Sequence, residues 1–348
     1  MSAREVTATG QAAAQTAGTA VAPTMTFGHA LGAVLVQAMN DDPRVFAFGE
    51  GINDRAGFFG STEGVAAKVG AGRCFDVPNC EETLVGMAIG ASLLGYRPVM
   101  VNLRIEFLML AMNQIVNHAA KWPSMSGGRA RVPITLRAMI GKHWGQAAQH
   151  SGALYPLFAH VPGLEVVVPG CFEDAPGLLL SAIQSDRPTM VIEEKPLYEL
   201  RGPVTFPIQP VPFGRARIVR PGKDITLVAV ATGVDLACRA ATALSARGVE
   251  AEVIDVRTIA PLDTETILAS IARTRRAAVM DIAWPRFGLA GEVARLVLTH
   301  DPGTLRGPLL TFGPRDAHAP ASVFLEQDHY PNLDRVVADL SRTLGVAA

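Results

Sequence analysis

The sequence has few charged residues and no long apolar run. Charged residues make up 18% of the 348 residues, and their signs nearly cancel to a formal net charge of -1. This balance gives no reason to expect a nucleic acid as a partner. No stretch reaches the roughly 18 consecutive apolar residues of a candidate transmembrane helix, so no membrane partner is expected either.

Cysteine is also scarce, and the chain has only Cys74, Cys80, Cys171 and Cys238. None of them forms a CxxC pair, and their spacing suits neither a disulfide framework nor a zinc site. We therefore expect a reducing, cytoplasmic environment. Residues 1–24 are small and polar and lack the apolar core of a signal peptide, so we predict a disordered tail there.

The common cofactor signatures are missing. The sequence contains no GxGxxG after its first predicted strand, no GxxxxGK[ST] loop, no GxSxG nucleophile elbow and no HExxH. A nucleotide-binding α/β domain is thus weakly supported, and isothermal titration with NAD and ATP would test it.

Apolar stretches of strand length alternate with helical patterns along the whole chain. A proline-rich segment from Leu200 to about Phe213 separates two such series. The alternation predicts an α/β fold with mostly parallel sheets that helices cover on both faces. We place the first domain at residues 25–205 and the second at 206–348. Within the first, residues 107–122 are predicted to form one long apolar helix that Pro123 ends.

Polar residues follow several predicted strands, where ligands bind in open parallel sheets. They are Glu50, Glu81, Arg104, Glu106, His143 and His150. Glu81 and Glu82 precede an almost wholly apolar helix. A carboxylate at such a position is stabilised by the helix dipole, so both glutamates could simply be helix-start residues.

Five motifs, in order through both predicted domains, resemble one protein family. They are "FDVPNCEETLVGMAIGASLLGYRPV", "AMNQIVNHAAK", "QHSGALYPLFAHVPGLEVVVP", "VIDVRTIAPLD" and "YPNLDRVV". Together they are similar to the β subunit of the thiamine-diphosphate-dependent 2-oxoacid dehydrogenase E1 component, which is related to transketolase. The resemblance implies a pyrimidine-binding α/β domain with a mostly parallel sheet, followed by a transketolase C-terminal-type α/β domain.

The resemblance also implies roles for particular residues. Glu81 matches the family's glutamate that bonds N1′ of the cofactor aminopyrimidine and promotes the tautomer that removes the C2 proton. Phe107 matches the aromatic side chain that packs on the pyrimidine, although a core aromatic is the alternative reading. His150 matches the active-site histidine, which relays protons or orients the acyl intermediate. Leu103 and Glu50, each at the end of a predicted strand, complete the expected cofactor-binding set.

Several positions depart from the family pattern. Arg104 stands where an apolar side chain is common, and Gly152 stands where glutamine is usual. The loop before His150 carries Lys142 and His143 in place of a glycine-rich stretch, and Gln149 lies beside it. Arg104, His143, Lys142 and Gln149 are therefore candidate substrate residues that would suit a carboxylate or phosphate group. The alternative for Arg104 is an ion pair with Glu106 or another carboxylate.

The family's GDG motif, which holds Mg²⁺ and the cofactor diphosphate, is absent from the sequence. The resemblance thus implies half an active site, completed by an E1 α-type subunit that holds Mg²⁺ in an α2β2 heterotetramer. The expected reaction is decarboxylation of a 2-oxoacid with transfer of the acyl unit to a lipoyl or carrier acceptor protein. Two alternatives stay open: transketolase-like two-carbon transfer from a ketose phosphate, and a non-catalytic β-like scaffold.

Overall fold

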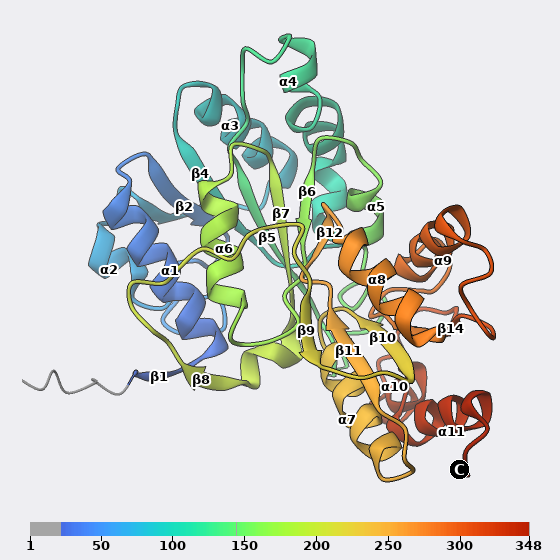
Figure 1. The fold of residues 1–348 in the computed structure, drawn as a ribbon. Helices are drawn as coiled ribbons and strands as arrows, with labels where there is room; N and C mark the ends of the chain where they lie inside the picture. The colour runs from blue at the N-terminus through green and yellow to red at the C-terminus, as the bar shows by residue number, and fades with distance from the viewer. Residues whose placement is uncertain (1–21, 144, 348) are drawn as a thin grey trace, which may run out of the picture.

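The protein was analysed as a computed structural model that describes residues 22–143 and 145–347. Most of the predicted tail, residues 1–21, lies outside the described residues. Figure 1 shows two α/β units, with the blue-to-green first half packed beside the yellow-to-red second half. The α/β prediction is confirmed. Among the described residues, no helix has both the length and the apolar character needed to cross a membrane.

The first sheet has seven strands in the order β12-β6-β7-β5-β4-β2-β3. Every neighbouring pair is parallel except β12 with β6, which is antiparallel. The strands are β2 (Val45–Gly49), β3 (Cys74–Asp76), β4 (Arg97–Asn102), β5 (Thr135–Ile140), β6 (Glu165–Val167), β7 (Thr189–Glu194) and β12 (Thr258–Ala260). Because β2 to β7 run in the same direction, their carboxyl ends meet along one edge of the sheet.

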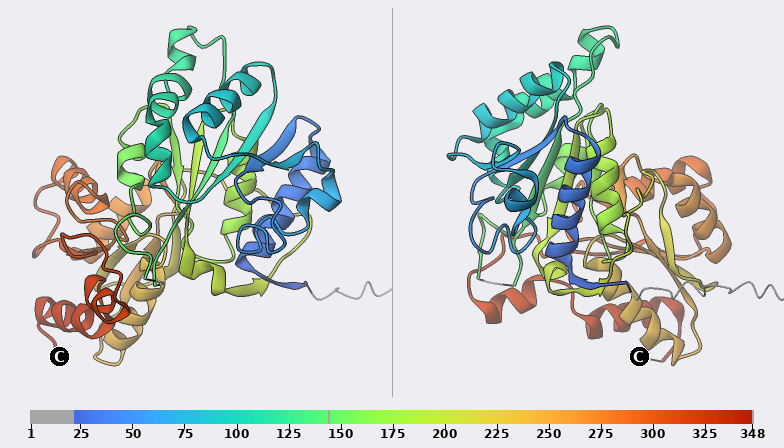
Figure 2. Two further views of the ribbon diagram at one scale, coloured as in Figure 1. Left: turned by 180° about the vertical axis from the view of Figure 1, so that it is seen from behind. Right: turned by 90° about the vertical axis from the view of Figure 1, so that its left-hand side faces the viewer.

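Helices cover both faces of this sheet, as the edge-on view in Figure 2 shows. On one face, α1 (Phe27–Asp41) and α6 (Ala175–Gln184) pack together over a shared apolar core. On the other face lies α3 (Glu81–Leu93), which contacts the segment after β4. Shorter helices are α2 (Val65–Val69), α5 (Tyr155–Ala159) and the 3-10 helix η3 (Lys195–Glu199).

The predicted single helix over residues 107–122 is wrong. The segment forms a 3-10 helix, η1 (Phe107–Ala111), and then a π-helical stretch, η2 (Asn113–Ala119). Pro123 does not end a helix, as predicted, but lies in the first turn of a new short helix, α4 (Trp122–Met125). A proline is tolerated in a first turn because the N–H that it lacks would have no partner there. A run of almost only apolar residues has too little polar contrast to show the periodicity of the helix, so it does not distinguish a π-helical stretch from an α-helix.

The second sheet has five strands in the order β14-β13-β10-β11-β9. They are β9 (Arg217–Arg220), β10 (Ile225–Ala229), β11 (Ala251–Asp255), β13 (Ala277–Met280) and β14 (Leu310–Phe312), and only the edge strand β9 is antiparallel to its neighbour. The helices are α7 (Gly233–Ser245), α8 (Thr264–Thr274), α9 (Leu289–His300), α10 (Val323–His329) and α11 (Leu333–Leu344). A separate pair, β1 (Thr24–Thr26) and β8 (Arg201–Pro203), joins the start of the described chain to the proline-rich segment.

The two halves share an extensive junction. Strand β12 leaves the second half to extend the first sheet. The carboxylate of Asp174 accepts hydrogen bonds from Arg217 and Arg257 of the second half. The buried Tyr155 hydroxyl donates to Asp281 at 2.6 Å. These contacts fix the carboxyl edge of the first sheet against the second half.

Candidate active site

The candidate site begins where three neighbouring strands end. Glu50 follows β2, Leu103 follows β4, and Glu81 follows the loop after β3. The Asn79 amide donates to Glu50 Oε1 at 2.6 Å and thereby fastens the loop before α3 to the end of β2. The sheet order β4-β2-β3 therefore brings these positions to one edge.

Glu81 is the first residue of α3 and is half-buried. Its helix buries Leu84, Val85 and Ala88 against the sheet, so the carboxylate stands on a rigid, apolar support. Within the described chain, no other side chain forms a hydrogen bond or ion pair with it. The neighbouring Glu82 differs, because it is exposed and accepts a hydrogen bond from Gln114 at 2.9 Å. The structure thus separates the two carboxylates, and Glu81 is the one open to a ligand.

Phe107 and His150 come together from separate segments. Their ring centroids are 5.5 Å apart with an interplanar angle of 89°, an edge-to-face contact. Phe107 is the first residue of η1, and His150 lies in the loop between β5 and α5, where its carbonyl accepts the Gly141 N–H at 2.7 Å. Both side chains are half-buried. Because the contact is edge-to-face, each ring keeps at least one face that the other ring does not cover.

Glu106 has a place in this site that its sequence position did not reveal. Its Oε1 accepts the Gly152 N–H at 2.6 Å, while its Oε2 is buried without a hydrogen-bond partner. Burial raises the pKa of this carboxyl to about 7, although the Gly152 hydrogen bond and the Arg104 charge lower it. Glu106 therefore ties the Phe107 segment to the His150 segment with a group that titrates near neutral pH. Only the three-dimensional closeness of these segments identifies it.

The titration of Glu106 makes a testable contribution to stability. Its unfolded carboxyl loses the proton near pH 4.5, but the folded one keeps it to about pH 7. The contribution of Glu106 to the free energy of unfolding is therefore fully present below pH 4.5, and it is lost as the pH rises through 7. We expect Glu106→Gln, which still accepts from Gly152, to lose less stability than the wild type between pH 5 and 7.5 in urea unfolding. Parallel losses in the two proteins would contradict the assignment.

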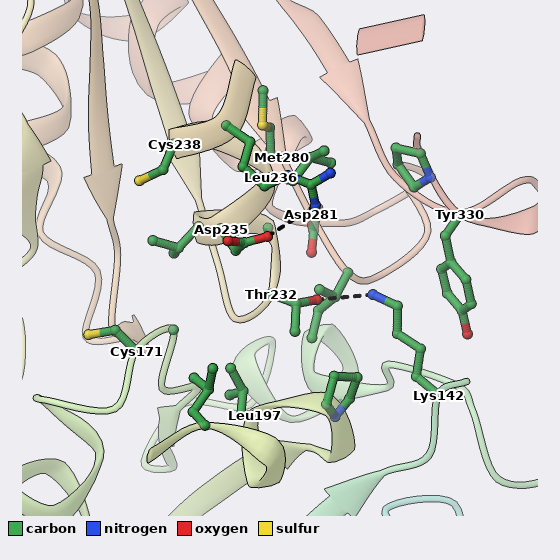
Figure 3. A pocket seen from close by; sticks show the side chains of 18 of the residues that line it. Lys142, Cys171, Leu197, Thr232, Asp235, Leu236, Cys238, Met280, Asp281 and Tyr330 are labelled. Atoms are coloured by element: carbon green, nitrogen blue, oxygen red, sulfur yellow. Dashed lines mark hydrogen bonds and ion pairs between the residues drawn. The ribbon is translucent and has the colours of Figure 1, made fainter. Parts of the chain in front are cut away.

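Lys142 and His143 lie at the junction of the two halves. Lys142 Nζ donates to Glu194 Oε1 and Thr232 Oγ1, each at 3.0 Å, and the other oxygen of Glu194 accepts the Thr232 N–H at 2.9 Å. Figure 3 shows Lys142 reaching Thr232 beside the Tyr330 ring, whose centroid is 4.5 Å from Nζ. Lys142, Thr232 and Tyr330 border a cavity of about 760 Å³ between the halves. The charge of Lys142 is thus already matched by Glu194.

His143 is held on the same side of the junction. The backbone N–H of His143 donates to Glu326 Oε1 at 2.8 Å. The centroids of the His143 and Tyr330 rings are 5.6 Å apart. The remaining substrate candidate of this loop, Gln149, is exposed. Lys142 and His143 therefore contact residues of the second half, whereas Phe107 and His150 contact each other.

The Lys142 contacts give a second prediction. We expect Lys142→Met to lower the free energy of unfolding by about 1–3 kcal/mol, because it leaves a buried Glu194 oxygen without its partner. Lys121→Met is the matched control, since exposed Lys121 bonds, among the described residues, only to the Asn117 side chain, and its loss is expected within about 0.5 kcal/mol. Equal shifts of the two variants in urea unfolding would contradict the junction role.

Arg104 forms no ion pair with Glu106 or any other carboxylate of the described residues. The side chain is buried; Nη2 donates to Gln146 Oε1 at 2.7 Å, and Nη1 lies 3.2 Å from Met139 Sδ. Its guanidinium also lies near the Phe59 ring, 5.9 Å from the centroid. The ion-pair alternative for Arg104 thus finds no support.

The site fits one end of a flat heteroaromatic cofactor. A carboxylate without a side-chain partner stands at the start of α3, and the half-buried Leu103 and Phe107 supply apolar surface after β4. Such a set can bond a ring nitrogen and stack on a ring face. Among the described residues, Cys171, Asp174 and Asp255 form a group whose ligand atoms lie within 4.8 Å of one another, and Glu50, Glu81 and Glu106 are not part of it.

Family models match almost all of the described chain. Residues 23–201 match the transketolase pyrimidine-binding domain, and residues 214–336 match the transketolase C-terminal domain. A solved split-gene transketolase, described as an inactive β4 tetramer, superposes with a TM-score of 0.76 at 21% identity, over 93% of this chain and 100% of that one. This likeness confirms the predicted fold.

Curated relatives are similar over nearly their full length. The β subunit of acetoin:2,6-dichlorophenolindophenol oxidoreductase from Cupriavidus necator is 38% identical, over 90% of this chain and 96% of that protein. The mitochondrial pyruvate dehydrogenase E1 component subunit β from Ascaris suum is 37% identical, over 92% and 91%. The Bacillus subtilis acetoin oxidoreductase β subunit is 36% identical, over 94% and 99%. The chain therefore belongs to the family of E1-type β subunits, built from a transketolase pyrimidine-binding domain and a transketolase C-terminal domain.

Proposed function

We propose that this chain is the catalytic β subunit of a thiamine-diphosphate-dependent 2-oxoacid dehydrogenase E1 component. The observation that carries the proposal is Glu81, a half-buried carboxylate at the start of α3 that has no hydrogen-bond or ion-pair partner among the described side chains, in a chain of this family. The Phe107–His150 contact supports it, because it supplies an aromatic face and a titratable group at the same edge of the sheet.

Each residue has a distinct task in this proposal. When bound, thiamine diphosphate would supply the electron sink that makes carbon–carbon cleavage next to a carbonyl feasible. Glu81 holds a proton at a pyrimidine nitrogen, and α3 keeps this carboxylate in place. Leu103 and Phe107 exclude water from the ring. His150 moves or holds a proton beside the substrate, and its position depends on the Gly141 and Glu106 contacts.

A partner chain is part of the proposal. Large apolar side chains are exposed along α3 and the elements next to it, namely Met87, Leu94, Tyr96, Leu110 and Met125. Because α3 begins with Glu81, a subunit that covered this surface would lie beside the candidate site. We propose that an E1 α-type subunit does so in an α2β2 heterotetramer and holds the diphosphate and Mg²⁺, with a lipoyl or carrier protein as acceptor. The four cysteines are free thiols, which suits the proposed cytoplasmic location.

Reconstitution with the matched α subunit tests the proposal. The complex should bind thiamine diphosphate with Mg²⁺ and should reduce an artificial electron acceptor with at least one 2-oxoacid. The β chain alone should bind the cofactor far more weakly, because it is expected to hold only the pyrimidine end. A complex that assembles and binds the cofactor but consumes no 2-oxoacid would contradict the proposal.

A further inference from the structure

The junction of the two halves holds a group of metal-ligand side chains that has no part in the proposed reaction. Cys171 and Asp174 lie between β6 and α6 in the first half, and Asp255 is the last residue of β11 in the second half. They offer a thiol sulfur and two carboxylate oxygens, which lie within 4.8 Å of one another. Asp174 is 6% exposed and Asp255 is 0% exposed. Donor atoms of both halves therefore converge on one buried place.

One oxygen of Asp255 is buried without a partner. Its Oδ1 accepts the backbone N–H of Arg257 at 2.9 Å, whereas its Oδ2 has no hydrogen-bond partner among the described residues. Oδ2 faces the segment that carries Cys171, because a Cβ built on Gly170 would lie 2.7 Å from this oxygen. A buried carboxylate oxygen without a partner is costly, and a bound cation would remove that cost.

The arginines around Asp174 leave room for a cation. Arg257 donates to both oxygens of Asp174, at 2.6 and 2.9 Å, and so matches the charge of this carboxylate. The second donor, Arg217, has a side chain that is 36% exposed, and it lies 3.9 Å from Glu173, to which it can turn. Asp174 can thus keep Arg257 as its counter-ion and offer a lone pair of Oδ2 to a cation.

Cys171 determines both the access to the group and the kind of cation. It borders the cavity of about 760 Å³ between the halves, and Figure 3 shows its side chain at the cavity wall. Its thiol donates to Asp174 Oδ2 at 3.1 Å. A thiolate with two carboxylates suits a zinc-like cation better than Mg²⁺ or Ca²⁺, and a water from the cavity can take the fourth tetrahedral position. Bonds of about 2.0–2.3 Å hold tetrahedral ligands roughly 3.3–3.8 Å apart, so the three atoms need to close by only about 1 Å.

We propose that Cys171, Asp174 and Asp255 bind a zinc-like divalent cation that ties the two halves of the chain together. The metal–sulfur bond forms as the thiol proton leaves to solvent, and the Cys171 thiolate and the Asp255 carboxylate balance the two charges of the cation. Because the ligands come from both halves, the cation binds the folded chain and stabilises it by mass action. None of the three side chains belongs to the candidate active site, and binding requires no thiamine diphosphate.

Titration of the reduced, metal-free full chain with Co²⁺ tests this site, because a cobalt–thiolate bond has a charge-transfer absorption band in the near ultraviolet. We expect one Co²⁺ per chain with this band, loss of the band when Zn²⁺ is added, no effect of Mg²⁺, and a higher Tm with Zn²⁺. Cys171→Ser should remove the band. Asp255→Asn, which can still accept from the Arg257 N–H, should weaken Co²⁺ binding by more than roughly 10-fold. Cys238→Ser is the matched control and should change neither, since this thiol borders the same cavity but is not part of the group.

A measurement on the wild type alone covers a variant that folds poorly. Zn²⁺ should slow the alkylation of Cys171 by at least roughly 10-fold, because the metal occupies the thiolate, and it should leave the alkylation of Cys238 unchanged. Mass spectrometry of the two peptides measures both rates. A wild type without the cobalt band, a band that survives Cys171→Ser, a band that Cys238→Ser removes, or equal rates of Cys171 alkylation with and without Zn²⁺ would each overturn the inference.

Discussion

Replacing Glu81 by glutamine is expected to lower kcat of the reconstituted complex by ~10²–10⁴-fold, the usual contribution of a positioned acid or base. Glutamine has nearly the same volume but cannot take up or share a proton. The Glu81 side chain forms no hydrogen bond or ion pair with the described residues that glutamine would break, and the folded structure should therefore be unaffected. Turnover and hydrogen–deuterium exchange at the cofactor's C2 position are the measurements. Both should fall together.

Glu82→Gln provides the matched control, because the same change is made one residue later on the same helix. Glu82 is exposed and, in the part of the chain that the structure describes, its side chain bonds only to Gln114, a contact that glutamine can also form. We expect less than a roughly threefold change in kcat, since a solvated surface carboxylate has little part in the chemistry. Normal turnover and normal C2 exchange in the Glu81 variant would mean that the chain is a scaffold and that the catalytic proposal is wrong.

The sequence predicted the fold because its signals are local. Alternating apolar strands and helices identify parallel sheets from composition and spacing alone, and the seven-stranded sheet confirms them. Strand β12 shows where this reasoning stops. It is a short segment of the second half that pairs with β6, and no local pattern tells a strand which sheet it will join.

The same limit applies to the site. Glu81, Phe107 and His150 could be proposed because each lies in a recognisable motif. Glu106 could not be assigned a role, because its hydrogen bond to Gly152 spans 46 positions of the sequence. Lys142 stays a predicted substrate residue, and its ion pair could not be foreseen from the sequence. Its loop carries the right charge, but Glu194, which matches that charge, is contributed by β7.

A buried ion pair beneath the site should dominate the stability of the first half. Arg137 of β5 and Glu193 of β7 are 0% and 1% exposed, and two hydrogen bonds of 2.7 and 2.9 Å join them. Arg137 also donates to the Ser61 hydroxyl at 3.0 Å, and the Tyr198 hydroxyl donates to Glu193. Burial opposes the charge of Arg137, but the Glu193 carboxylate outweighs this effect and holds the pKa of Arg137 above its ordinary value.

Arg137→Met is therefore expected to lower the free energy of unfolding by about 3–5 kcal/mol, because it leaves the Glu193 carboxylate buried without its cation. The double variant Arg137→Met, Glu193→Leu should recover much of this loss, since apolar side chains can replace both charges at once. Urea unfolding of the wild type, both single variants and the double variant measures the coupling. Additive losses in this cycle would show that the two side chains act independently, and the β5–β7 register would then owe its stability to apolar packing alone.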